Sequence, residues 1–364
     1  MKILQVITSL ETGGAECLVV NMVARLRAMG HEADVCVFNG QETPLMERLR
    51  KECPQAKIYK LGHGYYNPLY ILKLLRLMRR YDIVHTHNSS PQLLVAIASV
   101  LCSVGLCSTE HNTSNRKRHW KWYAPIESWM YGRYGHVVCI SQIAEEKLRE
   151  YMGGDWLVPS SKKYGRISTI NNGIDVAAFF QAAPLGELAH DGRFTTVMVA
   201  GFREAKDQDT LVRAMALLPD AYELWLVGVG VREPEVRKLV KELHLESRVR
   251  FLGMRMDVPR VLKSADVVAM SSHWEGLSLS NLEGMSVGKP FVASEVNGLR
   301  EVTQGAGILF PHGDAKALAD IIRRLHDDST YYEAIAQACH LRAMKYDIGE
   351  MVRKYEKVYE NLMK

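Results

Sequence analysis

The sequence has no long hydrophobic run, and this absence limits how the chain can relate to a membrane. No apolar stretch in its 364 residues approaches the roughly 18 residues that a membrane-spanning helix needs. The first ten residues contain a single lysine and turn polar too soon to form a secretory signal. Together these absences predict a cytoplasmic protein.

Several other signatures are absent as well. The seven cysteines are scattered without a CxxC pair, which predicts reduced core thiols rather than zinc ligands or disulfides. GxGxxG is missing, so there is no dinucleotide-binding fingerprint. The net charge is only +5 and no RNA- or DNA-binding motif occurs, which argues against a nucleic-acid partner.

The composition that is present indicates an ordinary globular protein. Hydrophobic residues make up 47% and charged residues 24%, and the length predicts two domains. The charge is uneven, because residues 1–175 hold 22 Lys and Arg against 15 Asp and Glu. Lys73–Arg80 and Arg116–Tyr123 concentrate these cations beside apolar residues. The first is interpreted as an ordinary amphipathic helix with a solvated face, and the alternative is a peripheral patch for an anionic membrane at its inner face.

The stretch Ser264–Glu301 is the most informative part of the sequence. Val267–Met270 and Lys289–Ala293 are short apolar runs typical of buried parallel strands, and the segment between them predicts a helix that begins near Ser278 or Ser280. Glu275 then lies in the loop that leaves the first strand, at the edge where open α/β sheets bind ligands.

Two carboxylates, Glu275 and Glu283, flank the start of this predicted helix. The backbone N–H groups at a helix start can hold a phosphate, and carboxylates beside it can accept hydrogen bonds from hydroxyl groups. A phosphate next to a polyol predicts a nucleotide sugar as the ligand.

The run from Glu275 to Glu283, followed by Gly288-Lys289-Pro290, resembles the E-x7-E region of retaining GT-B glycosyltransferases of family 4. The resemblance implies that Glu275 contacts the donor sugar and Glu283 the ribose. It also implies that backbone amides after the first carboxylate hold the diphosphate, which assigns donor-binding positions to Gly276, Leu277, Ser278 and Leu279. The chain departs from the family at Gly284, where an alanine is usual, and glycine weakens a helix interior by about 1 kcal/mol.

The second half contributes further donor-side positions. Phe194–Ala200 predicts a strand, and Arg203 and Lys206 follow it, where two cations suit a diphosphate. By the same resemblance Gly201 occupies the position of a phosphate-binding arginine, so either Arg203 replaces it or one phosphate contact is missing. Gly228 and Met254 end two later predicted strands and are assigned to donor binding.

The first half contributes the acceptor side. Gly13 and Gly14 form a glycine pair between a predicted strand and helix, matching the acceptor-side loop of the family. His85 and His87 end one predicted strand, and His111 with Asn112 follows the next. We expect His85 to be structural and His87 to hydrogen-bond acceptor hydroxyls. His111 matches a family histidine near the anomeric carbon, and Asn112 joins the acceptor side.

These expectations combine into one architecture. It is an α/β protein of the GT-B type, in which two Rossmann-like domains face a central cleft and a C-terminal helix crosses back to the first domain. The acceptor-binding domain is expected at 1–175 together with 346–364, and the nucleotide-sugar-binding domain at 176–345.

The expected activity is metal-independent hexosyl transfer with retention, without a cofactor, from a UDP- or GDP-linked sugar. The acceptor is a glycan or lipid-linked saccharide in cell-surface polysaccharide synthesis. His111, Glu275, Lys206 and Arg203 are the expected catalytic residues. Two alternatives stay open, a glycoside hydrolase that uses the glutamate pair and an inactive glycosyltransferase-like partner subunit.

Overall fold

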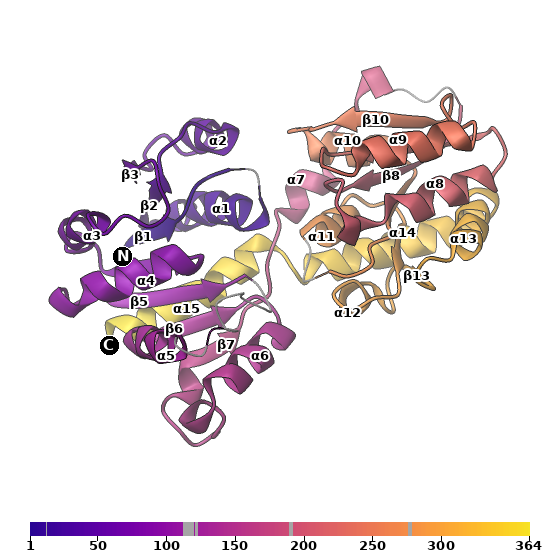
Figure 1. Cartoon of the computed structure of the whole chain (residues 1–364). Helices are drawn as coiled ribbons and strands as arrows, with labels where there is room; N and C mark the ends of the chain where they lie inside the picture. The colour runs from indigo at the N-terminus through magenta and orange to yellow at the C-terminus, as the bar shows by residue number, and fades with distance from the viewer. Residues whose placement is uncertain (12, 112–119, 121–122, 189–191, 276–278) are drawn as a thin grey trace. The chain divides into compact units, whose positions relative to one another are not determined.

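The computed structural model describes residues 1–364 apart from 12, 112–119, 121–122, 189–191 and 276–278. The chain forms two compact units (Figure 1). Unit 1 comprises Met1–Gly173 and Ile348–Lys364, and unit 2 comprises Ile174–Asp347. The borders expected from the sequence fall after residues 175 and 345.

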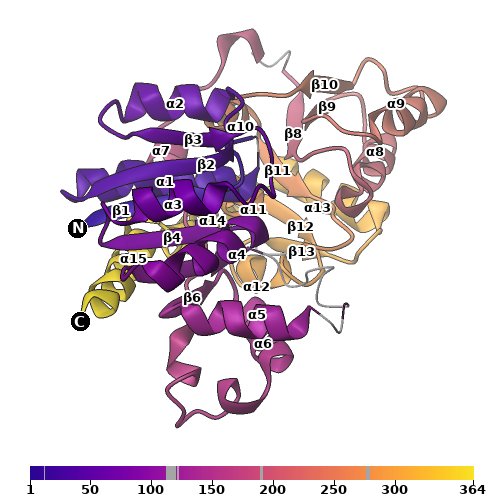
Figure 2. The same cartoon turned by 60° about the vertical axis from the view of Figure 1, so that its left-hand side comes forward.

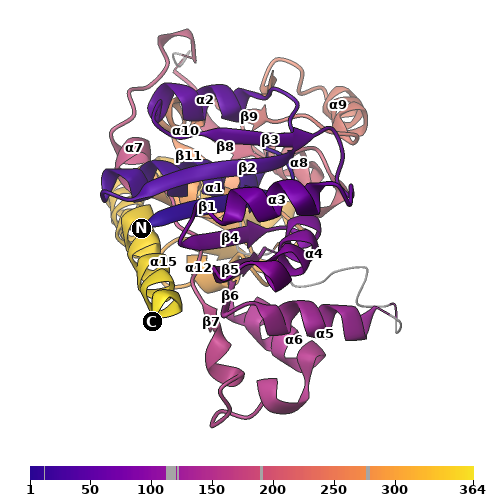
Figure 3. The ribbon, with the colours of Figure 1, turned by 90° about the vertical axis from the view of Figure 1, so that its left-hand side faces the viewer.

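Unit 1 is built on a parallel sheet of seven described strands in the order β3-β2-β1-β4-β5-β6-β7, which Figure 3 shows side by side. The strands are β1 (Lys2–Ile7), β2 (Glu32–Asn39), β3 (Ile58–Gly62), β4 (Ile83–His87), β5 (Gly105–Glu110), β6 (His136–Cys139) and β7 (Ile167–Thr169). The helices are α1 (Gly14–Ala28), α2 (Pro44–Glu52), α3 (Tyr70–Met78), α4 (Ser89–Ala98), α5 (Ala124–Arg133), α6 (Gln142–Met152) and α15 (Ile348–Met363).

The two faces of this sheet are covered by different helices. Side chains of β1 alternate between the faces, so Ile3 and Ile7 pack with α1, α2 and α15, whereas Leu4 and Val6 pack with α3 to α6. Helix α15 buries Met351, Tyr355 and Tyr359 against this first face. The predicted return of the C-terminal helix to the first domain is therefore confirmed.

Unit 2 contains a parallel sheet of six described strands in the order β10-β9-β8-β11-β12-β13 (Figure 2). The strands are β8 (Phe194–Val199), β9 (Tyr222–Val227), β10 (Val249–Gly253), β11 (Val267–Met270), β12 (Phe291–Ser294) and β13 (Ile308–Phe310). Its helices are α7 (Val176–Phe180), α8 (Gln208–Ala216), α9 (Glu233–Glu242), α10 (Val258–Ser264), α11 (Leu279–Ser286), α12 (Arg300–Thr303), α13 (Ala315–Asp327) and α14 (Ser329–Met344).

The core of unit 2 is again divided by its sheet. Helices α7, α10, α11, α12 and α14 contribute buried residues on one face, and α8, α9 and α13 on the other. Gly284 shows how closely α11 lies on the strands, because a β-carbon there would come within 2.7 Å of the Phe291 ring and 2.8 Å of Val268. The glycine that departs from the family pattern is thus a point of close packing.

Both units are α/β with parallel sheets, as the sequence predicts. The seven cysteines are free thiols, and five of them are buried. Among the described residues, no helix is both long enough and apolar enough to cross a membrane.

Candidate functional site

The candidate donor site of unit 2 starts from two neighbouring strands. Strands β8 and β11 pair in parallel, so the loops that follow them leave the same edge of the sheet. A single 3-10 turn, Glu204–Lys206, follows β8 and presents Lys206, while Glu275 follows β11. The ammonium of Lys206 forms an ion pair with Glu275, and both side chains are largely buried, at 20% and 9% exposure.

Glu275 has a second neighbour that the sequence analysis missed. The Ser272 hydroxyl donates to Oε1 of Glu275 at 2.8 Å, and this is the oxygen that pairs with Lys206. A cation and a hydroxyl therefore hold the carboxylate in one orientation. The pair offers a positive group for phosphate oxygens and an acceptor for sugar hydroxyls side by side.

Arg203 lies close to the position where the family carries its phosphate-binding arginine. A β-carbon built on Gly201 would lie 3.8 Å from Nε of Arg203 and 3.4 Å from the carbonyl oxygen of Val229, both ordinary contact distances. The guanidinium group of Arg203 thus occupies the space beside residue 201.

Gly228 has a structural reason to be glycine. Its φ of +136° disfavours residues with a side chain, and a β-carbon there would lie 2.3 Å from the carbonyl oxygen of Ala200. Met254, by contrast, follows β10 with its side chain 54% exposed. The first of these predicted donor-binding residues is required by backbone packing, and the second is presented to solvent.

Helix α11 begins at Leu279, one of the predicted donor-binding residues, and carries Glu283 half-buried. Within the described residues, neither amide atom of the fully buried Asn281 has a hydrogen-bond partner. An unpaired buried amide costs about 1–3 kcal/mol, so Asn281 marks the start of α11 as a place where polar contacts remain to be made. Three predicted positions, Gly276, Leu277 and Ser278, lie outside the described residues, as does Asn112.

The candidate acceptor site of unit 1 rests on a chain of buried histidines. His85 and His87 point to the same face of β4, with ring centroids 4.3 Å apart. His87 Nδ1 lies 2.9 Å from Nε2 of His111, and His87 Nε2 lies 2.8 Å from Oε1 of Gln5. His85 is hydrogen-bonded to Tyr359 at 2.7 Å and to Thr109 at 2.7 Å.

These contacts determine which nitrogen of each ring carries the proton. The Gln5 oxygen accepts from His87 Nε2–H, so Nδ1 of His87 is an acceptor and receives the Nε2–H of His111. That tautomer puts the acceptor lone pair of His111 on Nδ1. The Gln5 amide in turn donates to the Tyr359 hydroxyl at 3.3 Å, which carries the network onto α15.

Burial keeps this network neutral. It lowers the pKa of His85 to about 3, with a smaller contribution from His111, and lowers the pKa of His111 to about 4. It also lowers the pKa of His87 well below its ordinary value, helped by both neighbouring histidines. Neutral imidazoles can both donate and accept, as the hydrogen-bond chain requires.

The position of His87 changes the role that the sequence predicts for it. Its side chain is fully buried and both of its nitrogens are engaged within unit 1. It therefore orients His111, which is only partly buried and reaches the end of β5. Sequence reasoning missed Gln5, Tyr355 and Tyr359, because no local motif connects them to the histidines.

The glycine pair opens α1. Gly13 precedes the helix in extended conformation and Gly14 is its first residue. Close by in the sheet, Asn88 follows β4 with φ +69° and ψ 156°, a region that residues other than glycine rarely adopt. Its amide donates to Thr8 Oγ1 at 3.3 Å, joining the loops after β1 and β4.

Comparison with known proteins agrees with this arrangement. A family model described as Glycosyltransferase Family 4 matches residues 12–178, and one described as Glycosyl transferases group 1 matches residues 193–328. The crystal structure of Anabaena Alr3699/HepE in complex with UDP has a TM-score of 0.82 and 21% identity, covering 99% of this chain and 100% of that chain.

Two curated relatives cover most of the chain. Putative glycosyltransferase EpsD of Bacillus subtilis (strain 168) is 26% identical over 303 residues, or 78% of this chain and 77% of that protein. The UDP-Gal:alpha-D-GlcNAc-diphosphoundecaprenol alpha-1,3-galactosyltransferase of Escherichia coli is 25% identical over 319 residues, or 80% and 79%.

The fold is of the GT-B class. It has two parallel Rossmann-like sheets, a C-terminal helix packed on the first of them, and a match to a solved structure along nearly the whole length. The candidate sites in this fold are the ion pair of unit 2 and the histidine network of unit 1. Within it, the chain is a family 4-like glycosyltransferase.

Proposed function

We propose that the protein transfers a hexosyl unit from a nucleotide-diphosphate sugar to an acceptor hydroxyl, with retention of configuration. The observation that carries this proposal is the ion pair between Lys206 and Glu275 at the ends of β8 and β11. It sets one cation and one carboxylate side by side at the sheet edge where open α/β folds bind ligands.

The donor exchanges the partners of this pair. The diphosphate takes the ammonium of Lys206, and hydroxyls of the sugar donate to Glu275, which Ser272 continues to orient. Glu283 holds the ribose, while Met254 and Gly228 border the nucleotide. Because each charge receives a new partner, the buried pair opens without leaving an uncompensated charge.

The reaction breaks the bond between the anomeric carbon and the diphosphate oxygen and forms a bond to the acceptor oxygen on the same face of the sugar. A diphosphate oxygen takes the acceptor proton. Lys206, Arg203 and the amides of residues 276–279 stabilise the charge on the departing diphosphate. None of these steps uses a metal ion or another cofactor.

His111 serves the hydroxyls of the acceptor or of the donor sugar through Nδ1. The support is the tautomer that Gln5 and His87 impose, which makes Nδ1 the hydrogen-bond acceptor of the partly buried His111. Gly13 and Gly14 border the same acceptor side, to which the family resemblance also assigns Asn112. A neutral imidazole at this place positions a hydroxyl without bringing a second positive charge to the donor.

The acceptor is a glycan or lipid-linked saccharide at the inner face of the membrane. The E. coli relative is named for a diphosphoundecaprenol-linked acceptor and a UDP-linked donor, which supports this choice and favours UDP. Around α3, Tyr66, Leu69 and Leu72 are exposed beside the exposed cations Arg76 and Arg79. Apolar and cationic side chains together suit an anionic headgroup layer.

Liposome flotation tests the membrane contact. Replacing Arg76 and Arg79 by glutamine is expected to reduce binding to vesicles that contain phosphatidylserine. Equal flotation of the variant and the wild-type protein would contradict a role for α3.

The donor class is tested first by thermal shift. UDP-, GDP- and ADP-sugars are compared at equal concentration, and the UDP-sugar series is expected to raise the unfolding temperature most, because a ligand that binds the folded state stabilises it. No shift with any nucleotide sugar would contradict the proposed donor class.

The role of Glu275 is tested with a matched pair of variants. Glu275→Gln is expected to abolish transfer while the protein stays folded, since an amide cannot replace both lone-pair sites of the carboxylate. Glu295→Gln is the control, because Glu295 also follows a strand at this edge but is half-exposed and paired with Arg300 at 3.4 Å. Equal turnover of the Glu275→Gln variant and the control would reject the assigned role.

The same assay addresses the two alternatives. The relatives named above are glycosyltransferases, and none favours the glycoside hydrolase. Release of sugar from simple glycosides into water, without transfer, would be the mark of a hydrolase. Tight donor binding without transfer or hydrolysis in the wild-type protein would be the mark of an inactive partner subunit.

A further inference from the structure

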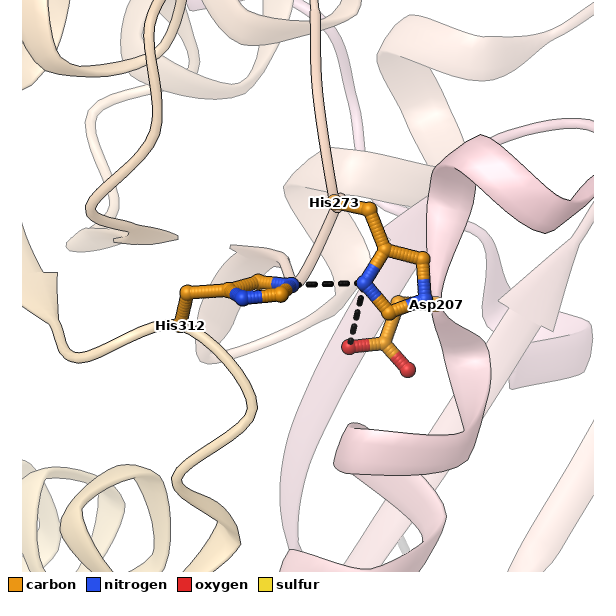
Figure 4. A group of neighbouring side chains, drawn as sticks. All are labelled: Asp207, His273 and His312. Carbon is orange, nitrogen blue, oxygen red and sulfur yellow. Dashed lines mark hydrogen bonds and ion pairs between the residues drawn. The ribbon is translucent and has the colours of Figure 1, made fainter.

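Three side chains outside the proposed chemistry converge at the same edge of unit 2 (Figure 4). Nδ1 of His273 lies 2.6 Å from Nε2 of His312 and 3.8 Å from Oδ2 of Asp207. All three ligand atoms lie within 4.8 Å of one another. The residues come from the loops after β8, β11 and β13, so three separate loops meet at one point.

A single proton cannot satisfy this arrangement. If His312 donates to His273, the single lone pair of His273 Nδ1 is used, and Nδ1 has no proton to donate to the Asp207 carboxylate. If His273 donates its Nδ1 proton to His312, no proton on that nitrogen remains for a hydrogen bond to the Asp207 carboxylate. A divalent cation, by contrast, can accept all three lone pairs at once.

We propose that Asp207, His273 and His312 bind a divalent transition-metal ion of the zinc type. Two imidazoles and one carboxylate with a further position open to solvent are a ligand set that zinc uses in proteins. His312 is exposed and His273 is partly exposed, so an ion can enter from solvent and keep a water ligand. The proposal goes beyond glycosyl transfer, because no step described above uses a metal.

Asp207 and the backbone of His273 are already held in position. Asp207 has φ +47° and caps α8, and its Oδ2 accepts from the Thr210 hydroxyl at 2.7 Å. Because a carboxylate oxygen has two lone pairs, Oδ2 can bind an ion and keep that hydrogen bond. The N–H of His273 donates to the carbonyl oxygen of Ala205 at 2.8 Å, and the Ser271 hydroxyl donates to the carbonyl oxygen of Asp207 at 2.6 Å.

The movement required for binding is small. Ligand atoms around tetrahedral zinc, with bonds of about 2.0–2.1 Å, lie about 3.3 Å apart. The two imidazole nitrogens must therefore separate slightly from 2.6 Å, and the carboxylate must approach from 3.8 Å. Most of this shift falls to His312, which is exposed and follows the short strand β13.

Occupation of the site would connect loops that carry the proposed donor-binding residues. Lys206 precedes Asp207 in the chain, and Glu275 follows His273 by two positions. The ion fastens the loops after β8 and β11 to the loop after β13. It acts in this way as a positioning group for the donor site, with no part in bond making.

Zinc binding to the full-length protein tests the proposal directly. The protein is stripped with a chelator, the chelator is removed, and zinc is titrated in competition with a chromophoric zinc indicator. We expect one high-affinity zinc ion per chain. The absence of a site that competes with the indicator would overturn the proposal.

Variants test the three ligands individually. His312→Ala and His273→Ala are expected to weaken zinc binding by more than the roughly 10–100-fold that loss of an outer-shell partner costs. Asp207→Asn keeps a residue that can cap the helix and tolerate positive φ, and it is expected to weaken binding as well. Unchanged affinity in any of these three variants would overturn the three-ligand site.

A matched control separates the site from ordinary surface histidines. His326 and Asp327 form an exposed pair with 2.8 Å between Nδ1 and Oδ1, in the same unit but without a third ligand in the described residues. His326→Ala is expected to leave zinc affinity unchanged, and an equal loss in this control would overturn the proposal. Zinc should also raise the unfolding temperature of the wild-type protein but not of His312→Ala, a readout that is independent of transfer activity.

Discussion

The buried histidines of unit 1 predict that mild acid weakens this unit selectively. The perturbation is a shift from pH 7.5 to pH 5.5, where most Asp and Glu side chains, with pKa values near 4, stay ionised. His85 and His87 are both fully buried in unit 1. Unit 2 of the same molecule therefore serves as the internal reference.

The sign follows from the difference between the folded and unfolded states. Burial lowers the pKa of His85 to about 3 and lowers that of His87 well below its ordinary value. In the unfolded chain both titrate near 6.5, so below that pH the unfolded state binds more protons. The stability is fully present above pH 6.5 and is lost as the pH falls toward the folded pKa values.

The magnitude can be worked out per histidine. At pH 5.5, an imidazole with an unfolded pKa of about 6.5 stabilises the unfolded state by about 1.4 kcal/mol on protonation. If His85 and His87 stay neutral in the folded unit, unit 1 loses about 3 kcal/mol. His111 has a pKa lowered to about 4, and although it is only partly buried, its protonation acts in the same direction.

Hydrogen exchange read by mass spectrometry during urea unfolding can measure each unit separately. Peptides from β4 and β5 report on unit 1, and peptides from β8 and β9 report on unit 2. His85→Gln removes one titrating group, so the loss of stability of unit 1 at pH 5.5 should be smaller by about 1.4 kcal/mol in this variant. A change of less than about 1 kcal/mol in unit 1, or an equal loss in unit 2, would refute the reasoning.

Three further predictions concern unit 2. Gly284→Ala should destabilise the protein by up to about 2 kcal/mol, because overpacking costs about 1–3 kcal/mol and the better helix propensity of alanine offsets about 1 kcal/mol. Urea denaturation would measure the change, and a stabilised variant would contradict the close packing described. Arg203→Ala should lower kcat/KM by about 10–100-fold through loss of one charge-assisted phosphate contact. Adding Gly201→Arg should restore part of the activity, since residue 201 has room for a side chain. Steady-state kinetics would measure both, and wild-type kcat/KM in the Arg203→Ala variant would count against the phosphate contact. Lys206→Met should destabilise unit 2 by about 3–5 kcal/mol, because it leaves the Glu275 carboxylate buried without its cation. Glu275→Gln should destabilise unit 2 less, because Lys206 is more exposed than Glu275. Equal unfolding free energies for the two variants would contradict this asymmetry.

Much of the fold was predictable because parallel sheets have a strong sequence pattern. Short apolar runs alternating with helical segments indicated the strands, and the polar residues after them identified the functional edge. The sequence predicts both Lys206 and Glu275 on this basis, although 69 positions separate them in the chain. Their pairing across adjacent strand ends follows from the topology.

The role of His87 was not predictable in the same way. The spacing of His85 and His87 indicated a common face of β4, but not which helix covers that face. Gln5 and Tyr359, which complete the network, lie 354 positions apart and have no motif in common with the histidines. Only the packing of α15 shows that the face is closed.

The cluster of Asp207, His273 and His312 was missed for a related reason. Metal sites are recognised in sequence when ligands recur at short spacings on one element. Here each ligand stands alone in its own loop, and only the parallel order of β8, β11, β12 and β13 brings the loops to one edge. Gly284 is a similar case, since a residue that looked unfavourable for a helix is explained by the Phe291 ring beneath it.

The hydrogen bond between Gln5 and Tyr359 also has a consequence for folding during synthesis. A ribosome releases β1 and β4 before unit 2, and α15 only after it. Until α15 emerges, Gln5, His85 and Thr109 lack the tyrosine hydroxyls that pair with them. Unit 1 is thus completed by a helix that is translated after unit 2, so a nascent chain that stops before Ile348 can complete the core of unit 2 while the histidine network of unit 1 stays open.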